Sequence, residues 1–533
     1  MRPDLTLRTT IYIVTLMAVI QFAIQISLLA RGVEYIASSL VIDDTYYYLQ
    51  TAWNTKQLGF VTFDGLHATN GVQLLWFVII LLLTLLVKTK IALLFATLAV
   101  VFLLNGLCYL FIVIIGAELK QPVLALFMAS LWSLQSLPWR IYSMGMENSL
   151  HALVFWFLIW QSVIFLIRVQ TGERPNFWGL TVALILNVWT RLDAALLSVT
   201  LFTFYIGMLV YAYRSNLKIF YESYKKVIVG CILLAGVALI AQMTAFKVIG
   251  DSFLPVSAIV KTSGTSWALE KESATKFVEV VLEGMPSILQ GRFPPLVLIL
   301  VAISGILLLL RAQFGRRDKP LELRAFLNLW FCLLVGELLY EFYIAVSGVK
   351  YMPYFIWYRS PAFIFWIISA SLIAFFIFDH FKMAIQNSSY LRWTPVGFSL
   401  LIFAISLYMF ARSINFTSKL YTTRYHVAKW LAQNSPPDTI FASWNAGQLG
   451  YFSDRTFINL DGVINNIDYY QRVLRGSIPL TDYLSENEVD YIVDYDSYAS
   501  IPDFLVVHTF PINDGSDRAI HIWQVSSEIA STP

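Results

Sequence analysis

The chain has 533 residues, of which 58% are hydrophobic and 13% are charged, and its mean hydropathy is +0.66. Soluble domains carry about 25% charged residues, so this composition indicates a protein that crosses a membrane several times. The net charge of only +3 gives no support for nucleic-acid binding. The cysteines, Cys108, Cys231 and Cys332, all lie in apolar segments, which argues against a disulfide framework or a metal cluster.

The apolar runs predict about eleven transmembrane helices. Candidate spans cover residues 11–30, 73–88, 91–116, 121–137, 148–168, 177–192, 194–213, 227–248, 293–311, 325–346, 361–381 and 394–413. The first span is followed by Arg31 rather than by a small-residue cleavage site, which favours an uncleaved helix.

The basic loops determine the expected orientation. Segments such as Arg214–Lys226 and Lys382–Arg392 should face the cytoplasm. Twelve full spans would place both chain ends on one side of the membrane, whereas these loops favour opposite sides. We therefore expect one element between Gly71 and Leu137 to be short, re-entrant or merged, and Asn105-Gly106 is a place where the 91–116 run could break.

The tail changes character from about Arg424. Its apolar runs shorten to four or five residues bounded by Asp, Asn, Gly or Pro, which is typical of strands, and they cover 439–442, 456–460, 491–493 and 520–523. Residues 425–432 and 467–474 have helical spacing, whereas 444–452 and 459–465 suit tight turns. We expect a transmembrane domain over 1–415, with an external loop at 31–73, and an extracytoplasmic α/β domain over 416–533.

The external loop opens on two adjacent carboxylates, Asp43 and Asp44, followed by three tyrosines. Asp44 is placed to cap a helix from Thr45 to about Gln57 that would lie flat at the membrane interface. Ionisable groups at membrane depth are costly, which makes both acids functional candidates. A capped interfacial helix without chemistry remains the alternative.

Four further places carry charged side chains near the expected outer surface. Glu147 precedes a long span and has the alternative of a helix N-terminal acid. Arg191 and Asp193 form the tip of a helical hairpin and have the alternative of a structural ion pair. Lys261 begins an external segment and has the alternative of a snorkelling lysine. Tyr358-Arg359 lies in an aromatic loop that an interfacial belt would also explain.

The sequence lacks zinc-ligand spacing, a phosphate-binding Walker loop, a nucleophile elbow and a dinucleotide fingerprint. It therefore gives little support for an ATP-driven pump or a metalloenzyme, and we expect no cofactor and no dedicated metal site.

The chain contains an ordered set of short motifs: Asp43-Asp44 with the tyrosines, Phe63-Asp64-Gly65, Thr69-Asn70-Gly71 with Trp76, Gly145-Met146-Glu147, Arg191-Leu192-Asp193, Pro255-Val256-Ser257 with Lys261, Gly450-Tyr451 and Asn459-Leu460-Asp461-Gly462. Taken in order, these motifs resemble those of bacterial GT-C glycosyltransferases, nearest to the branch that includes the mycobacterial terminal arabinofuranosyltransferase. The stretch from Thr69 to Trp76 departs from the arabinosyl form, so the resemblance does not name arabinose as the sugar.

The resemblance implies a polytopic membrane enzyme that takes its sugar from a polyprenyl-phosphate donor and, in most members, inverts the anomeric centre. It implies a first-loop carboxylate as general base, for which we take Asp43, with Asp44 as helix cap or acceptor-orienting group, and these two roles could be exchanged. The same reading assigns Arg191, Lys261, Tyr358 and Arg359 to the donor phosphate. It assigns Asn70, Glu147 and Asp193 to sugar or acceptor hydroxyls.

The acceptor could be a glycan, a lipid or a protein on the outer face of the plasma or inner membrane. Two other classes of function remain. A transporter or flippase of a lipid-linked sugar would use the same cavity without a base and often contains inverted repeats, of which the sequence shows no sign. A non-catalytic membrane scaffold would use the tail domain as a binding module.

Overall fold

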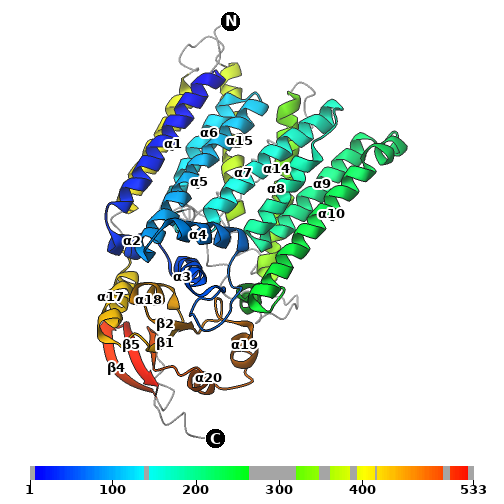
Figure 1. The fold of residues 1–533 in the computed structure, drawn as a ribbon. Helices are drawn as coiled ribbons and strands as arrows, with labels where there is room; N and C mark the ends of the chain where they lie inside the picture. The colour runs from blue at the N-terminus through cyan, green and yellow to red at the C-terminus, as the bar shows by residue number, and fades with distance from the viewer. Residues whose placement is uncertain are drawn as a thin grey trace.

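The computed structural model shows a bundle of long helices with a small C-terminal domain at one end (Figure 1). The residues that it describes are 6–136, 143–262, 320–346, 360–384, 393–413, 417–495 and 504–525. The start of α1 and the connection between α9 and α10 lie at the end of the bundle opposite the C-terminal domain. The first helix and the basic Arg214–Lys226 loop therefore begin on the side away from the tail, as the loop charges predict.

Eight helices within the described ranges are long and apolar enough to cross a membrane. They are α1 (Leu7–Leu29), α5 (Lys90–Glu118), α7 (Asn148–Thr171), α9 (Ala195–Ala212), α10 (Leu217–Gly250), α14 (Leu321–Val346), α15 (Ser360–Ala384) and α16 (Thr394–Ser413). A helix rises about 1.5 Å per residue, so about twenty residues span the hydrocarbon core. The chain is a multi-pass membrane protein, and the predicted span at 293–311 lies outside the described residues.

Three apolar helices are shorter: α4 (Leu74–Leu86), α6 (Pro122–Trp132) and α8 (Phe177–Thr190). The 13 residues of α4 reach only about 20 Å, which is less than the apolar core of a bilayer. The prediction of a short element between Gly71 and Leu137 is confirmed. The suggested break at Asn105-Gly106 is wrong, because α5 continues through it; the Asn105 carbonyl accepts from Trp132 Nε1 at 3.3 Å, and one helical glycine costs only about 1 kcal/mol.

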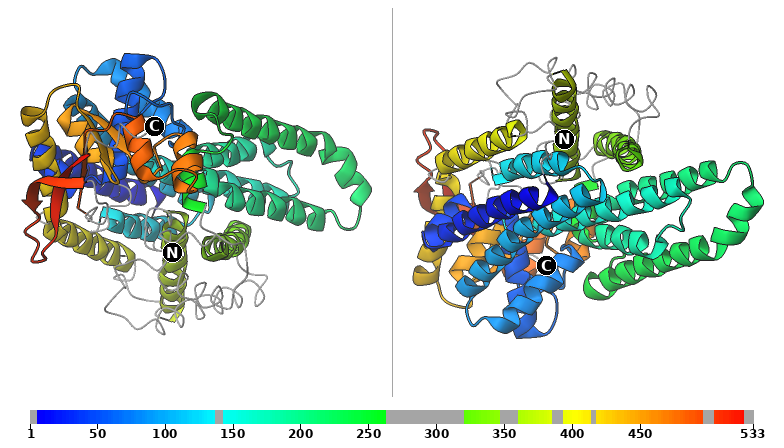
Figure 2. Two further views of the ribbon diagram at one scale, coloured as in Figure 1. Left: turned by 90° about the horizontal axis from the view of Figure 1, so that it is seen from below. Right: turned by 90° about the horizontal axis from the view of Figure 1, so that it is seen from above.

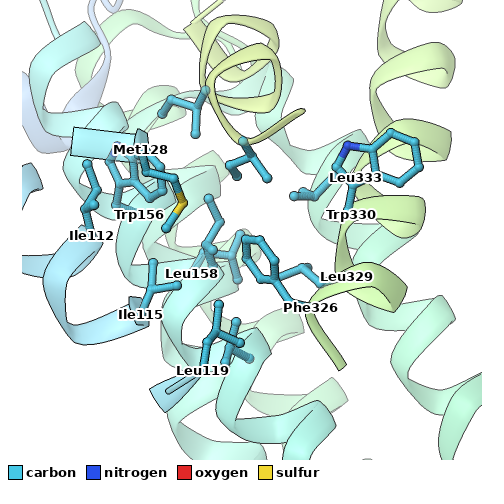
Figure 3. Close-up of a cluster of buried hydrophobic side chains, with 14 of the residues drawn as sticks. Ile112, Ile115, Leu119, Met128, Trp156, Leu158, Phe326, Leu329, Trp330 and Leu333 are labelled. Carbon is cyan, nitrogen blue, oxygen red and sulfur yellow. The ribbon is translucent and has the colours of Figure 1, made fainter. Parts of the chain in front are cut away.

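The bundle is held together by apolar side chains from α5, α6, α7 and α14 that meet in one cluster (Figure 3). Its labelled members are Ile112, Ile115, Leu119, Met128, Trp156, Leu158, Phe326, Leu329, Trp330 and Leu333. In the most apolar 18-residue stretch of α7, 72% of the residues are buried, whereas in the corresponding stretch of α10 only 11% are buried. Helix α7 is therefore central, whereas α9 and α10 project to one side of the bundle (Figure 2).

Within residues 417–495 and 504–525, the C-terminal domain is a five-stranded sheet with four helices. The helices are α17 (Lys419–Asn434), α18 (Ala446–Ser453), α19 (Ile467–Tyr469, continued by a π-turn over Tyr470–Leu474) and α20 (Leu480–Glu486). The strands are β1 (Ile440–Ser443), β2 (Thr456–Asn459), β3 (Tyr491–Asp494), β4 (Phe504–Pro511) and β5 (Ala519–Val525). The order is β2-β1-β3-β5-β4; β1 is parallel to β2 and β3, and β5 is antiparallel to β3 and β4.

The four predicted strands correspond to β1, β2, β3 and β5. Strand β4 was not predicted, because its exposed apolar run Leu505–Val507 does not alternate with polar residues. The segment read as a turn after β1 is largely the helix α18.

Helix α3 (Asp43–Leu58) lies between the end of the bundle and the C-terminal domain (Figure 1). Its Tyr46 and Leu49 are fully buried in a cluster that includes Leu94 of α5 and Tyr451 and Phe452 of α18. The expected helix therefore exists, and its buried face packs between the bundle and the C-terminal domain. Its N-cap is Ile42, and no side chain caps it, so the prediction of Asp44 as the cap is wrong.

Candidate active site

A pocket of about 180 Å³ opens where the bundle meets the C-terminal domain. Its charged and tyrosine side chains are Asp44, Tyr47 and Tyr48 of α3, Glu147 before α7, Arg191 and Asp193 at the turn that includes η2 (Leu192–Ala194), Lys261 of α11 (Val256–Thr262) and Tyr343 of α14. Val463 of the C-terminal domain completes the wall. The fold thus brings five of the predicted site residues into one cavity.

Asp44 lies in the first turn of α3 and is half-buried at the pocket. Burial raises the pKa of its carboxyl to about 6; Lys261 opposes the shift, and the negative charges of Asp43 and Glu147 add to it. A carboxylate with a pKa close to neutral pH is both ionised and basic enough to accept a proton from a substrate hydroxyl.

Asp43, one residue earlier, points away from the pocket. Its Oδ2 accepts from the Gly447 N–H at 3.0 Å, its Oδ1 accepts from the Gln448 N–H at 2.9 Å, and Arg424 Nη1 lies 3.8 Å from Oδ1. The side chain is 5% exposed. The choice of Asp43 as base does not fit this geometry, because both oxygens face the C-terminal domain. Of the two acids, Asp44 lines the pocket and Asp43 does not.

Arg191 is engaged by two carboxylates. Its Nη1 donates to Glu147 Oε1 at 2.8 Å, and its Nε and Nη2 donate to Asp193 at 3.1 and 2.7 Å. The Tyr48 hydroxyl donates to Glu147 at 3.0 Å, and the Tyr340 hydroxyl donates to Asp193 at 2.7 Å. This network fits the alternative of a structural ion pair better than a phosphate contact. It holds the wall of the pocket beside Asp44.

Asn70 does not line the pocket. It is fully buried, its Oδ1 accepts from the Val256 N–H at 2.8 Å, and its Nδ2 donates to the carbonyls of Phe246 and Ser252, both at 3.0 Å. The amide therefore ties the first loop to the connection between α10 and α11. Helix α11 carries Lys261, so the hydrogen bonds of Asn70 connect the first loop to the element that brings Lys261 to the pocket.

Several residues at the site were missed as candidates, among them Tyr47 and Asp461. The Tyr47 hydroxyl donates to Asp461 Oδ2 at 3.3 Å, which brings an acid of the C-terminal domain next to the pocket. Burial raises the pKa of Asp461 to about 7, and Asp44 and Asp43 add to the shift. Asp461 stood within a motif that resembled a GT-C sequence, but its turn-like surroundings gave no separate signal.

The predicted phosphate contacts Tyr358 and Arg359 lie outside the described residues. Within the described part of the chain, no group of three or more His, Cys, Asp or Glu side chains is arranged to hold a metal ion.

The architecture is that of the GT-C fold, a polytopic helical membrane protein with a small C-terminal domain. The fold is similar to the crystal structure of ArnT from Cupriavidus metallidurans bound to undecaprenyl phosphate, with a TM-score of 0.56 and 12% identity over 97% of this chain and 99% of that one. The apo structure of ArnT gives a TM-score of 0.50 and 13% identity over 97% and 100% of the two chains. At these identities the likenesses show the fold alone, and they do not support the mycobacterial branch.

At the level of sequence, residues 413–528 match a family described as a domain of unknown function, DUF8728. No protein with a curated description matches the chain.

Proposed function

We propose that this protein is a glycosyltransferase that moves a sugar from a polyprenyl-phosphate donor to an acceptor hydroxyl at the membrane surface beside the C-terminal domain. The observation that carries the proposal is the presence of Asp44 and Lys261 in one pocket, with the pKa of Asp44 raised to about 6. The fold likeness to ArnT, whose structure holds undecaprenyl phosphate, favours the same class of donor.

The reaction needs two groups that this pocket supplies. The acceptor oxygen attacks the anomeric carbon, the bond from that carbon to the phosphate oxygen breaks, and Asp44 takes the proton of the acceptor hydroxyl. The departing polyprenyl phosphate gains negative charge, which Lys261 stabilises. A single displacement of this kind inverts the anomeric configuration. Arg191, with Glu147 and Asp193, keeps the wall rigid while the donor binds.

The position of the pocket suits a lipid-linked substrate. It lies at the end of the bundle, so a donor chain in the bilayer can bring its phosphate to the pocket. The basic loop between α9 and α10 lies toward the other end, so the proposed location is the outer face of the plasma or inner membrane. The sugar and the acceptor, whether glycan, lipid or protein, are to be identified by the assay below.

The test is a donor screen on the purified full-length protein in detergent. A panel of polyprenyl-phosphate sugars is offered with mixed membrane-glycan acceptors, and free polyprenyl phosphate is followed by mass spectrometry. We expect release from one donor, its loss in Asp44→Asn, and full release in the control Asp251→Asn, whose side chain is exposed outside the pocket.

Other outcomes point to other functions. Release that survives in Asp44→Asn would remove the base assignment. If no donor is cleaved, but lipid-linked sugar crosses proteoliposome membranes, the protein is a flippase. If neither occurs, the scaffold reading gains support.

A further inference from the structure

The C-terminal domain meets α3 at the carboxyl ends of its parallel strands. The three parallel strands β1, β2 and β3 all end toward α3 and the segment around it: Trp444 and α18 follow β1, Asp461 follows β2, and Asp494 ends β3. At these strand ends Asn459 Nδ2 donates to the Tyr47 hydroxyl at 3.1 Å. The carboxyl ends of parallel strands are where α/β domains place loops that bind other groups. Here they hold part of the same chain.

The group held most tightly is the carboxylate of Asp43. The two N–H donors at the start of α18, Gly447 and Gln448, reach its two oxygens separately, and Arg424 stands beside it. Asp43 therefore occupies the position of an N-cap for α18 although it comes from a different domain. The charge suits the positive end of the helix.

Gly447 shows that the approach is close. A Cβ atom built on Gly447 would collide with the backbone carbonyl of Asp43 and lie 3.0 Å from its Oδ2. Only glycine lets α18 come this near to the first turn of α3.

The residues on either side of Asp44 are fixed by different partners. Asp43 is held by α18, whereas the Thr45 hydroxyl donates to the Met144 carbonyl at 2.7 Å, in the segment that leads to Glu147. Successive side chains on a helix point about 100° apart. Because the side chains of Asp43 and Thr45 are both held, the rotation of this helical turn is fixed. The side chain of Asp44, which lies between them in the sequence, is thereby directed into the pocket.

We propose that the C-terminal domain is a positioning device for the catalytic loop, in which α18 grips Asp43 and thereby aims Asp44 at the acceptor. Asp43 is a positioning residue and Asp44 the catalytic one, and this assignment rests on the proposed glycosyl transfer. The matched domain of unknown function thus supplies part of the active-site geometry.

Aromatic packing already joins the two domains, with Tyr46 5.2 Å from the rings of both Tyr451 and Phe452. A buried carboxylate adds cost to an interface unless it is fully paired. The hydrogen bonds from α18 to Asp43 therefore do more than join the two domains. They also fix the rotation of the first turn of α3 about its helix axis.

The test uses the full-length protein with Asp43→Asn, which keeps the shape but cannot accept two N–H bonds with one charged carboxylate. Gly447→Ala disturbs the same contact from the other side without changing the amino-acid sequence of α3. The matched controls are Glu34→Gln, which removes a domain contact to His426 away from the pocket, and Gly106→Ala, at a helical glycine with open space around it.

Two readouts separate the possible roles. Hydrogen exchange of peptides over residues 43–50 and 446–453 should be at least about tenfold faster in both variants than in their controls. Turnover of the donor should fall about 10- to 100-fold in kcat, with KM for the donor changed less than about threefold, because misplacing a catalytic group by about 1 Å costs on that order.

Unchanged exchange, or unchanged kcat, would overturn the proposal. The proposal would also be overturned if the fraction of protein able to bind donor fell by the same factor as turnover. That result is expected of a contact that only stabilises the fold. If the wild-type protein cleaves no donor, the exchange data still decide whether α18 holds the loop, and only the proposed function fails.

Discussion

The Arg191 guanidinium lies 2.8 Å from Glu147 and 2.7 Å from Asp193, so one buried cation joins the start of α7 to the turn between α8 and α9. The side chains of Arg191 and Glu147 are 3% and 4% exposed. This wall stands beside the pocket acid Asp44, so changes to it test both the stability and the chemistry of the site.

Arg191→Lys should cost most of the activity although the charge is kept. A lysine cannot donate to Glu147 and bidentately to Asp193 at once. Arg191→Met leaves Glu147 and Asp193 without their shared cation and with only the hydroxyls of Tyr48 and Tyr340 as donors, which should cost about 3–5 kcal/mol. Thermal unfolding in detergent and donor turnover measure both effects. The control Arg472→Lys, in an exposed ion pair with Glu486, should change neither, and normal activity in Arg191→Lys would contradict the network as an active-site support.

Activity should rise with pH through a limb near pH 6. The pKa of Asp44 is raised to about 6, so below that pH the carboxyl is protonated and kcat/KM should fall about tenfold per pH unit. The charged groups that act on Asp44 are Asp43, Glu147 and Lys261. Because Lys261 lowers the pKa of Asp44, Lys261→Gln should move the limb to higher pH. A midpoint of the pH–rate curve below pH 5, or a midpoint that does not change in Lys261→Gln, would argue against Asp44 as the base.

Lys261→Gln should also weaken binding of polyprenyl phosphate. One charge-assisted hydrogen bond contributes about 1.5–3 kcal/mol, which corresponds to about 10- to 100-fold in affinity. Inhibition by the free lipid phosphate measures this directly. Lys247→Gln is the matched control, since Lys247 pairs with Asp251 on the surface. Equal inhibition of both variants by the free lipid phosphate would contradict the assignment of Lys261 to the phosphate.

Asn70→Asp should displace α11. A carboxylate cannot donate to the carbonyls of Phe246 and Ser252, and leaving such groups unpaired costs about 1–3 kcal/mol. We expect a lower melting temperature and a higher KM for the donor. Asn434→Asp, exposed and bonded only to Trp430, should behave as wild type in both assays. If Asn70→Asp changes kcat alone, the result would instead support the sugar contact that the sequence predicts for Asn70.

The C-terminal domain should react with a membrane-impermeant maleimide on intact cells. Ser477→Cys places an exposed thiol on this domain, and Ser215→Cys places one in the basic loop between α9 and α10. The native cysteines are buried and should give little background. We expect the first to be labelled in intact cells and the second only after permeabilisation, and the reverse pattern would invert the orientation.

The position of most helices followed from local sequence, because twenty apolar residues in a row satisfy both the bilayer and the backbone. The span predicted at 148–168 is α7 at Asn148–Thr171. Helix α18 was missed for a physical reason: Gly447 and Gly450 are typical of turns, but here they let α18 approach Asp43 and Phe457 closely.

The sequence by itself determined a polytopic membrane protein, a small α/β tail and the set of charged residues from which the site is built. Only the tertiary structure decided the roles. Asp43 and Asp44 are chemically identical neighbours, and no local pattern tells them apart. Their difference comes from contacts about 400 residues away in the chain, where α18 supplies N–H donors to one carboxylate and leaves the other to the pocket. Long-range packing, which sequence spacing does not encode, sets which acid lines the pocket.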